Sequence, residues 1–205
     1  MYKKYFKRVL DFCGALLGLI LLSPLLLAVA VIIKLTSPGG VFYRQTRVGK
    51  DRKLFTILKF RSMRIDVQVK PAKYSIVTNA DPRITWIGKI IRRTKIDELP
   101  QLINVLYGDL SIVGPRPTLE VYLPDYEKWE LKRFSVKPGL SGLAQINGNI
   151  FLNRIEKSYY EIKYIKNITF LSDIKIVLRT IKIMFCGEEN FVNHPSLEEI
   201  ELVKK

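Results

Sequence analysis

The longest apolar stretch of the chain runs from Phe12 to Ile33 and contains no charged residue. About 20 apolar residues are the length that an α-helix needs to cross the hydrocarbon core of a membrane. Ser23 and Pro24 lie at the middle of this stretch, and a proline inside a helix removes a backbone donor and crowds the preceding turn. The pattern therefore predicts a membrane helix within residues 1–36 that is broken at Ser23-Pro24.

Two membrane topologies fit this helix, because both of its flanks are basic. The flanking residues are Lys3, Lys4, Lys7 and Arg8 on one side and Lys34, Arg44, Arg47, Lys50, Arg52 and Lys53 on the other. Basic flanks favour the cytoplasmic side of a membrane. A re-entrant helix that bends at Pro24 would keep both flanks there, whereas an ordinary kinked span would place one of them outside.

The residues after this helix predict an α+β, helix-rich globular domain over residues 37–187. Val41 to Tyr43 and Leu54 to Leu58 are rich in β-formers, and the polar residues between them predict a β-hairpin. The other predicted elements are a polar loop over 66–82, helices over 84–93, 99–107 and 118–133, and a short strand over 141–146.

An amphipathic helix is predicted over residues 172–185, capped by Ser172 or Asp173. Its apolar face consists of Ile174, Val177, Leu178, Ile181 and Phe185, and Lys175, Arg179 and Lys182 lie off that face. Such a helix either lies on a membrane surface or packs in a core with its basic face in water, and the pattern leaves both open. Residues 188–205 are rich in glutamate and are expected to form a loosely ordered acidic tail.

The charge balance narrows the class of partner. The chain has 34 Lys and Arg residues against 19 Asp and Glu, a net charge of +15. Such a surplus suits an anionic partner: a membrane surface, a nucleotide, a phosphate or a nucleic acid. Two cysteines and one histidine leave almost nothing for Ser-His or Cys-His catalysis or for a zinc site. Carboxylates are therefore the main candidates for chemistry, and a metal, if used, should be a hard oxygen-bound ion such as Mg²⁺.

Asp97 and Glu98 are the candidate catalytic residues, because they precede the 99–107 helix. The helix dipole and the free backbone N–H groups favour ionised carboxylates there, although acidic first turns are also ordinary capping. Asp97 is the candidate nucleophile, since carboxylates form phosphoryl-enzyme intermediates. Four basic residues are candidates for phosphate or substrate binding: Lys59, Arg61, Arg92 and Arg116. Pro115 and Pro117 stiffen the backbone around the last of them.

Six short motifs in order make the sequence recognisable. They are Lys59-Phe60-Arg61-Ser62-Met63, Asp81-Pro82-Arg83-Ile84-Thr85, Asp97-Glu98-Leu99-Pro100-Gln101-Leu102, Gly108-Asp109-Leu110-Ser111, Val113-Gly114-Pro115-Arg116-Pro117 and Lys137-Pro138-Gly139-Leu140-Ser141-Gly142. The sequence resembles the monotopic phosphoglycosyl transferases, the bacterial sugar transferase family, from about Tyr5 to Phe185. The chain looks like the minimal catalytic form of that family.

The resemblance implies the topology and the reaction. It implies a re-entrant helix broken at Ser23-Pro24 and a catalytic domain on the cytoplasmic face of the bacterial inner membrane. It implies that Asp97 and Glu98 are catalytic and that both also hold a Mg²⁺ ion. The reaction it implies moves a sugar-1-phosphate from a UDP-sugar to undecaprenyl phosphate. UMP is released, and the product starts a surface glycan.

One position departs from the family pattern. Family members often carry Arg directly after the Asn-Gly of the loop that follows Pro-Gly, and Asn149 stands there in this chain. The anion contact is then either missing or supplied by Arg154. Two other readings compete with the transferase: a non-catalytic basic membrane adaptor, and a nucleic-acid-binding protein, for which the sequence contains no recognised motif.

Overall fold

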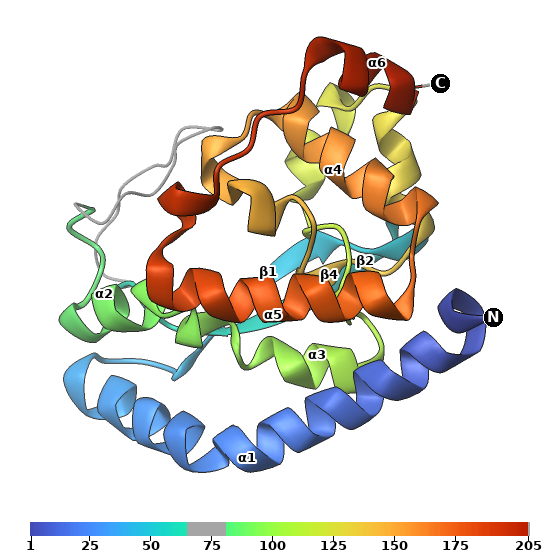
Figure 1. Ribbon diagram of the computed structural model, residues 1–205. Coiled ribbons are helices and arrows are strands. Elements are labelled where there is room, and N and C mark those ends of the chain that lie inside the picture. Colours follow the sequence, from blue (N-terminus) through green and yellow to red (C-terminus); the bar gives the residue numbers. More distant parts are fainter. Residues whose placement is uncertain (65–80, 205) are drawn as a thin grey trace.

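Helix α1 (Lys7–Thr36) lies along one edge of the molecule and bends in its middle (Figure 1). The computed structural model describes residues 1–64 and 81–204, and a single π-helical turn, Tyr2–Phe6, precedes α1. The helix is continuous through Ser23-Pro24, so the predicted break is a bend. Its backbone explains why: Pro24 cannot donate to the carbonyl of Ile20, and the Ser23 hydroxyl donates to that carbonyl instead, at 2.7 Å.

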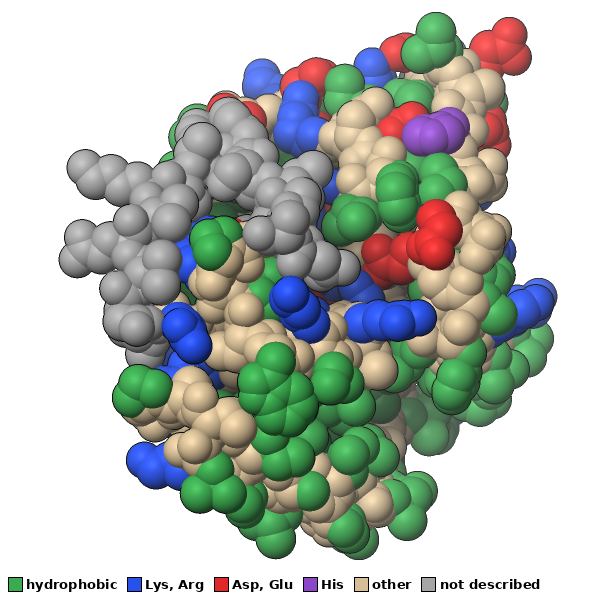
Figure 2. Space-filling model, turned by 90° about the vertical axis from the view of Figure 1, so that its left-hand side faces the viewer, with side chains coloured by type: hydrophobic (Ala, Val, Ile, Leu, Met, Phe, Trp, Pro, Cys, Tyr) green, Lys and Arg blue, Asp and Glu red, His purple; other side chains and the backbone are tan. Residues whose placement is uncertain are grey.

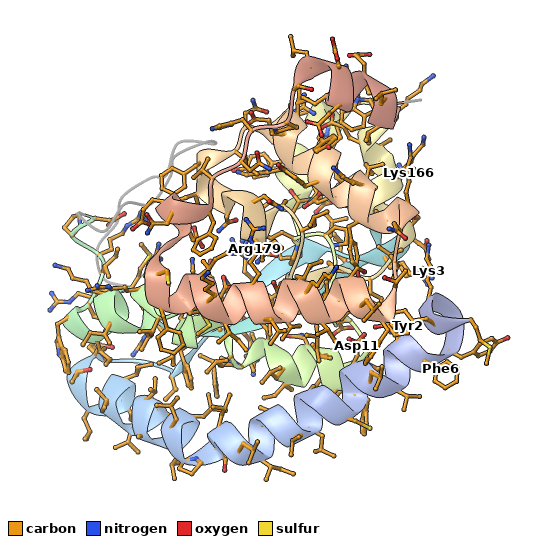
Figure 3. The ribbon with its side chains drawn as sticks, viewed as in Figure 1. Tyr2, Lys3, Phe6, Asp11, Lys166 and Arg179 are labelled. Carbon is orange, nitrogen blue, oxygen red and sulfur yellow. The ribbon has the colours of Figure 1, made fainter. Side chains whose placement is uncertain are left out.

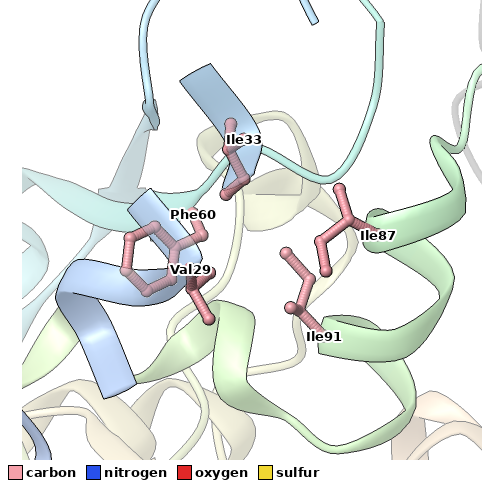
Figure 4. Close-up of a cluster of buried hydrophobic side chains, with 5 residues drawn as sticks. All are labelled: Val29, Ile33, Phe60, Ile87 and Ile91. Atoms are coloured by element: carbon pink, nitrogen blue, oxygen red, sulfur yellow. The ribbon is translucent and has the colours of Figure 1, made fainter. Parts of the chain in front are cut away.

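One side of α1 packs on the domain and the rest of its surface is exposed. Val29 and Ile33 pack with Phe60, Ile87 and Ile91 in a buried cluster (Figure 4). A second cluster joins the first half of the helix to α3 through Ala15, Leu102, Val105 and Leu110. Only 11% of the most apolar 18-residue window is buried, and its mean hydropathy is 3.0. Within the described residues, α1 is the one helix long and apolar enough to cross a membrane.

The predicted β-hairpin is confirmed. Strands β1 (Phe42–Val48) and β2 (Leu54–Phe60) pair antiparallel, from Phe42 opposite Phe60 to Val48 opposite Leu54. A short 3₁₀ turn, Lys50–Arg52, joins them. The loop expected over 66–82 lies outside the described residues, apart from Asp81 and Pro82.

Two short helices follow, close to their predicted positions. Helix α2 (Trp86–Arg93) begins at Thr85, whose hydroxyl accepts from the Gly88 backbone N–H at 2.9 Å. Helix α3 (Gln101–Tyr107) ends at Gly108 in the left-handed conformation. The buried Asn104 side chain accepts from the Leu58 N–H and donates to the Thr56 carbonyl. This clamp fixes α3 against β2 and is the kind of contact that helical periodicity does not predict.

The middle of the chain differs most from the predictions. Strands β3 (Ser111–Val113) and β4 (Gly139–Ser141) pair in parallel, so the strand predicted over 141–146 lies earlier and is shorter. The helix predicted over 118–133 is wrong. The structure has two separate 3₁₀ segments, Glu120–Asp125 and Glu130–Ser135, and Pro124 within the first cannot donate a helical hydrogen bond.

Two long helices cover the domain. Helix α4 (Arg154–Lys166) follows two 3₁₀ turns, Gln145–Asn147 and Asn149–Phe151, and has a capping box at Asn153. Helix α5 (Phe170–Cys186) is longer than predicted and is capped by Thr169. Its buried residues are Asp173, Ile176 and Ile183. Of the predicted apolar face, Val177 is partly buried against the core and the other four residues are exposed. The exposed apolar residues of α5 are Phe170, Leu171, Ile174, Leu178, Ile181, Met184 and Phe185.

The acidic C-terminal segment is folded, so the expectation of a loosely ordered tail is wrong. A 3₁₀ turn, Glu188–Phe191, follows α5, and helix α6 (Leu197–Lys204) packs against α4 (Figure 1). Ile200 is buried in one cluster with Tyr159 and Tyr160. The helix therefore buries an apolar residue while its glutamates face water.

Figure 2 shows how side-chain types are distributed on one face. Hydrophobic side chains gather in the lower part of the view, and Lys and Arg side chains form a band above them. The exposed apolar residues of the described chain include Leu21, Leu27 and Leu35 on α1 and Trp86 and Ile90 on α2. An apolar surface bordered by cations suits a membrane interface.

Candidate active site

The two candidate catalytic carboxylates lie in a 3₁₀ turn between α2 and α3. This turn, Ile96–Glu98, carries Asp97 and Glu98, and Leu99 and Pro100 separate it from the first residue of α3. Lys95 precedes the turn with φ +59, a left-handed conformation that is uncommon for a lysine and that reverses the chain after α2. The tight turn brings Asp97 to a position that is only 8% exposed.

Glu98 is the centre of a charge cluster. Its Oε1 accepts from Lys59 Nζ at 2.6 Å and from Arg116 Nη2 at 2.8 Å. Lys59 comes from β2 and Arg116 from the loop after β3, so three separate segments meet at one oxygen. Because a carboxylate held by two cations is charge-assisted on both sides, Glu98 fixes the positions of Lys59 and Arg116.

The surroundings of the two carboxyl groups shift their pKa values in opposite directions. Burial raises the pKa of Asp97 to about 6, and the nearby charge of Glu98 adds to this rise, while Lys59, Arg92 and Lys95 oppose it. Burial would also raise the pKa of Glu98, but Arg116 and Lys59 outweigh it and hold that pKa well below its ordinary value. Both groups are therefore mainly ionised at neutral pH, and Asp97 is the more basic of the two.

The Asp97 carboxylate differs from that of Glu98 in having no polar partner within the described part of the chain. Among the described residues, none forms a hydrogen bond or an ion pair with it. Its neighbours Lys59, Arg92 and Lys95 are close enough to act on its pKa. An ionised, poorly solvated carboxylate beside cations is suited to attack a phosphorus atom whose oxygens those cations hold.

The Arg116 loop is held by close backbone packing. A Cβ on Gly139 would come within 2.0 Å of the Gly114 nitrogen, so the loops after β3 and before β4 touch along their backbones. The Arg116 N–H donates to Glu161 Oε1 at 3.1 Å, and the Arg116 carbonyl accepts from Arg133 at 2.7 Å. Glu161 and Arg133 are a buried pair at 2.9 Å. Sequence reasoning missed this pair, because neither residue stands in a motif.

The structure brings some of the predicted anion-binding residues together and separates others. Lys59 and Arg116 meet at Glu98, and Arg92 on α2 acts on the pKa of Asp97. Arg61 lies elsewhere: its guanidinium is buried and donates to the Pro38 carbonyl and to the carbonyl and hydroxyl of Ser37. These bonds tie the end of α1 to the hairpin, which is a structural role.

A large cavity opens beside Arg116. Its volume is about 770 Å³, and Arg116 is one of five basic residues in its wall, with Arg47, Arg133, Arg154 and Lys157. Asn149 also lines it, with its side chain donating to Glu188 at 3.0 Å. Arg154 is paired with Glu130. Asn149, which stands where family members often carry Arg, and Arg154, its possible substitute, therefore both line the cavity. The cavity is basic and large enough for a nucleotide-sugar.

Replacing Arg116 by Lys should lower turnover about 10- to 100-fold, the equivalent of a lost charge-assisted hydrogen bond. A lysine keeps the charge but cannot contact Glu98 and a phosphate with the same planar fork. Steady-state kinetics against Arg93→Lys, an exposed position on α2, would measure the difference. Near wild-type turnover for Arg116→Ala would remove this residue from the site.

The sequence matches one known protein family over most of its length. Residues 2–187 match the model of the bacterial sugar transferase family, so the chain is a member of that family. The match includes helix α1 and the whole site described above.

Several curated relatives are similar over most of the chain. One is an N-acetylgalactosamine-phosphate transferase of Aeromonas hydrophila, named as acting between UDP-N-acetylgalactosamine and undecaprenyl phosphate (40% identical; 89% of this chain and 44% of the relative). Another is the UDP-glucose:undecaprenyl-phosphate glucose-1-phosphate transferase of Escherichia coli K12 (43%; 85% and 39%). The exopolysaccharide production protein PSS of Rhizobium leguminosarum bv. phaseoli is 41% identical over 85% of this chain and 92% of its own length. The chain thus spans about two fifths of the first two relatives and nearly all of the third.

Proposed function

We propose that this protein transfers a sugar-1-phosphate from a UDP-sugar to undecaprenyl phosphate. The products are a polyprenyl-diphosphate-sugar and UMP, and the reaction is the first membrane step of surface glycan synthesis. The observation that carries the proposal is the pairing of Glu98 with Lys59 and Arg116, next to Asp97 in the chain and beside a basic cavity, in a member of the bacterial sugar transferase family. The names of its relatives support this donor and this acceptor.

Asp97 is the nucleophile in the proposed mechanism. Its carboxylate oxygen attacks the β-phosphorus of the UDP-sugar, and the bond between that phosphorus and the oxygen of UMP breaks. The sugar-phosphate is then covalently bound to Asp97. An oxygen of undecaprenyl phosphate attacks the same phosphorus, the bond to Asp97 breaks, and the carboxylate is regenerated. Arg116, Lys59 and Arg92 hold the phosphate oxygens during both displacements.

The carboxylates fit a magnesium ion. The Asp97 carboxylate is unbonded among the described residues, and the two cations that contact Glu98 are both on its Oε1. Mg²⁺ commonly uses one or two protein carboxylates together with substrate phosphates. Glu98 and Asp97 are therefore the residues that would hold it. A bound Mg²⁺ supplies charge that neutralises the diphosphate and stabilises the leaving UMP.

The membrane geometry proposed is monotopic, with the domain on the cytoplasmic face of the inner membrane. The bend in α1 and the Ser23 hydroxyl that satisfies Ile20 support a helix that dips into one leaflet and returns. The outward-facing apolar residues of α5, such as Leu178 and Phe185, support a helix lying on the membrane surface. Basic flanks at both ends of α1 suit the cytoplasmic side.

Replacing Ser23-Pro24 by Ala-Leu should straighten α1 and convert it to a full span. Leucine at position 24 restores the backbone donor to the Ile20 carbonyl, and the two substitutions together remove the cause of the bend. A cysteine placed at residue 2 and labelled in intact cells, with Cys13 and Cys186 replaced by Ser, would report the side of the N-terminus. We expect no labelling from the periplasm in the parent and labelling in the Ala-Leu variant. Periplasmic labelling of the parent would contradict the re-entrant topology.

The test of the function is the release of UMP. Membrane-extracted protein would be incubated with undecaprenyl phosphate and a panel of UDP-sugars, and UMP would be measured for each donor. We expect release with at least one donor and dependence on the acceptor for repeated turnover. Release with none, from folded protein, would favour the membrane adaptor over the transferase.

A further inference from the structure

A second basic pocket lies at the N-terminal end of α1. It has a volume of about 300 Å³ and shares no lining residue with the cavity beside Arg116 or with the smaller space around Glu98. Five cationic side chains line it against one carboxylate. The cations are Lys3, Lys7, Arg8, Lys50 and Lys137, and the acid is Asp11.

The carboxylates near this pocket are already engaged. Asp11 accepts from the backbone N–H of Ile112 at 3.0 Å, and Asp173 pairs with Lys7 at 2.5 Å. Of the five cations, Lys7 is the one with an ion pair among the described residues. The pocket therefore carries more positive charge than its own acids neutralise.

Two of the cations converge on the backbone of Gly108, which has no side chain. Arg8 Nη2 and Lys137 Nζ each lie 3.2 Å from the point that a Cβ on Gly108 would occupy. Arg8 is held there by donating to the carbonyls of Val105 and Leu106 at the end of α3. Burial lowers the pKa of Lys137, and the charges of Arg8 and Lys50 lower it further. A bound anion would relieve this repulsion.

The wall of the pocket is fixed to the rest of the domain. The Tyr2 hydroxyl donates to Asp173 at 2.7 Å, and the Tyr164 hydroxyl donates to the other oxygen of the same carboxylate at 2.8 Å. Together with Lys7, these bonds join the first turns of the chain to the beginning of α5. These bonds hold the N-terminal wall of the pocket in place against the domain.

The surroundings of the pocket are amphipathic. Figure 3 shows Lys3 and Phe6 extending in opposite directions from the first turns of the chain. Phe6, Val9 and Leu10 are exposed apolar side chains, whereas Lys3 lines the pocket. A ligand with a phosphate next to acyl chains would match both sides, because lipid phosphates lie at the boundary between hydrocarbon and water.

We infer that this pocket binds the phosphodiester headgroup of an anionic phospholipid, such as phosphatidylglycerol. The adjoining apolar residues favour a lipid over free phosphate. The site would fix the N-terminal end of α1 at the membrane surface. This inference does not depend on the transfer reaction, so UMP release and lipid binding can fail separately.

The test is lipid retention by the full chain. Protein in a neutral detergent would be mixed with equal amounts of phosphatidylglycerol and phosphatidylcholine and examined by native mass spectrometry. The pocket variant is Lys3→Gln/Lys50→Gln/Lys137→Gln. Its matched control is Lys89→Gln/Lys175→Gln/Lys182→Gln, which removes the same charge from exposed positions on α2 and α5. A third arm adds inorganic phosphate to the wild type.

We expect the wild type and the control to retain phosphatidylglycerol preferentially and the pocket variant to lose about tenfold of this preference, since each lysine near an anionic headgroup contributes measurably. Equal losses in both variants, or none in the pocket variant, would overturn the inference. Displacement of the lipid by an equal concentration of inorganic phosphate would overturn the assignment to a lipid. If the unfolding midpoint of the triple variant falls, Lys3→Gln alone, at an exposed position, should still lower the preference about threefold.

Discussion

Asp97→Asn should abolish turnover, with a fall of roughly 10⁴-fold or more, because an amide of nearly the same shape is not a nucleophile. The variant should also fail to form a covalent adduct. The measurement is to incubate the enzyme with a sugar-labelled donor and no lipid, and to look for label on the peptide that contains Asp97 by mass spectrometry. The wild type should carry the sugar-phosphate on this peptide.

The matched control is Asp51→Asn, the same chemical change at an exposed position in the hairpin turn. Asp51 has φ +54, which asparagine adopts readily, so this variant should keep both adduct and turnover. A wild type without adduct, together with kinetics that require both substrates bound at once, would replace the covalent scheme by direct transfer. Asp97 would then only orient groups or bind the metal.

Glu98→Gln should lower turnover on the order of 100-fold, because the glutamine can neither neutralise Lys59 and Arg116 nor hold both. The loss should be accompanied by a higher Mg²⁺ concentration for half-maximal activity, whereas a purely structural role would lower turnover at every Mg²⁺ concentration alike. The measurement is UMP release across a Mg²⁺ titration. Glu120→Gln, at an exposed position, is the control.

The requirement for Mg²⁺ can be tested separately from the role of Glu98. Excess EDTA should abolish UMP release by the wild type, and added Mg²⁺ should restore it. Full activity in EDTA would show that the carboxylates work without a metal. An unchanged Mg²⁺ requirement in Glu98→Gln would instead move the metal to Asp97.

The sequence determined those features that arise from neighbouring residues. An uncharged stretch of 22 residues from Phe12 to Ile33 is enough to specify an apolar helix. Ser23-Pro24 specifies its bend, since the proline removes one donor and the serine before it can supply another. The hairpin, α2 and α3 follow from β-propensity, helical periodicity and caps in the same way. The six motifs were enough to single out Asp97 and Glu98.

The tertiary structure decided which of the candidate residues act together. Glu98 lies 39 residues from Lys59 and 18 from Arg116, yet one oxygen of its carboxylate contacts both. Arg61 is in the same motif as Lys59 but lies just past the end of β2, where its guanidinium donates to the Ser37 and Pro38 carbonyls at the end of α1. Such pairings depend on how separate segments pack, which no local pattern contains.

Burial was the other property that only the tertiary structure decided. The sequence predicts an apolar stripe on α5 but not the direction in which it faces, and the structure exposes four of its five residues and packs only Val177 against the core. The support of Arg116 by Glu161, which is 45 residues away, likewise exists only because α4 packs behind the loop. The pKa of Asp97 rises for the same reason: a carboxylate loses its water when other segments cover it, and the identity of those segments is a property of the fold.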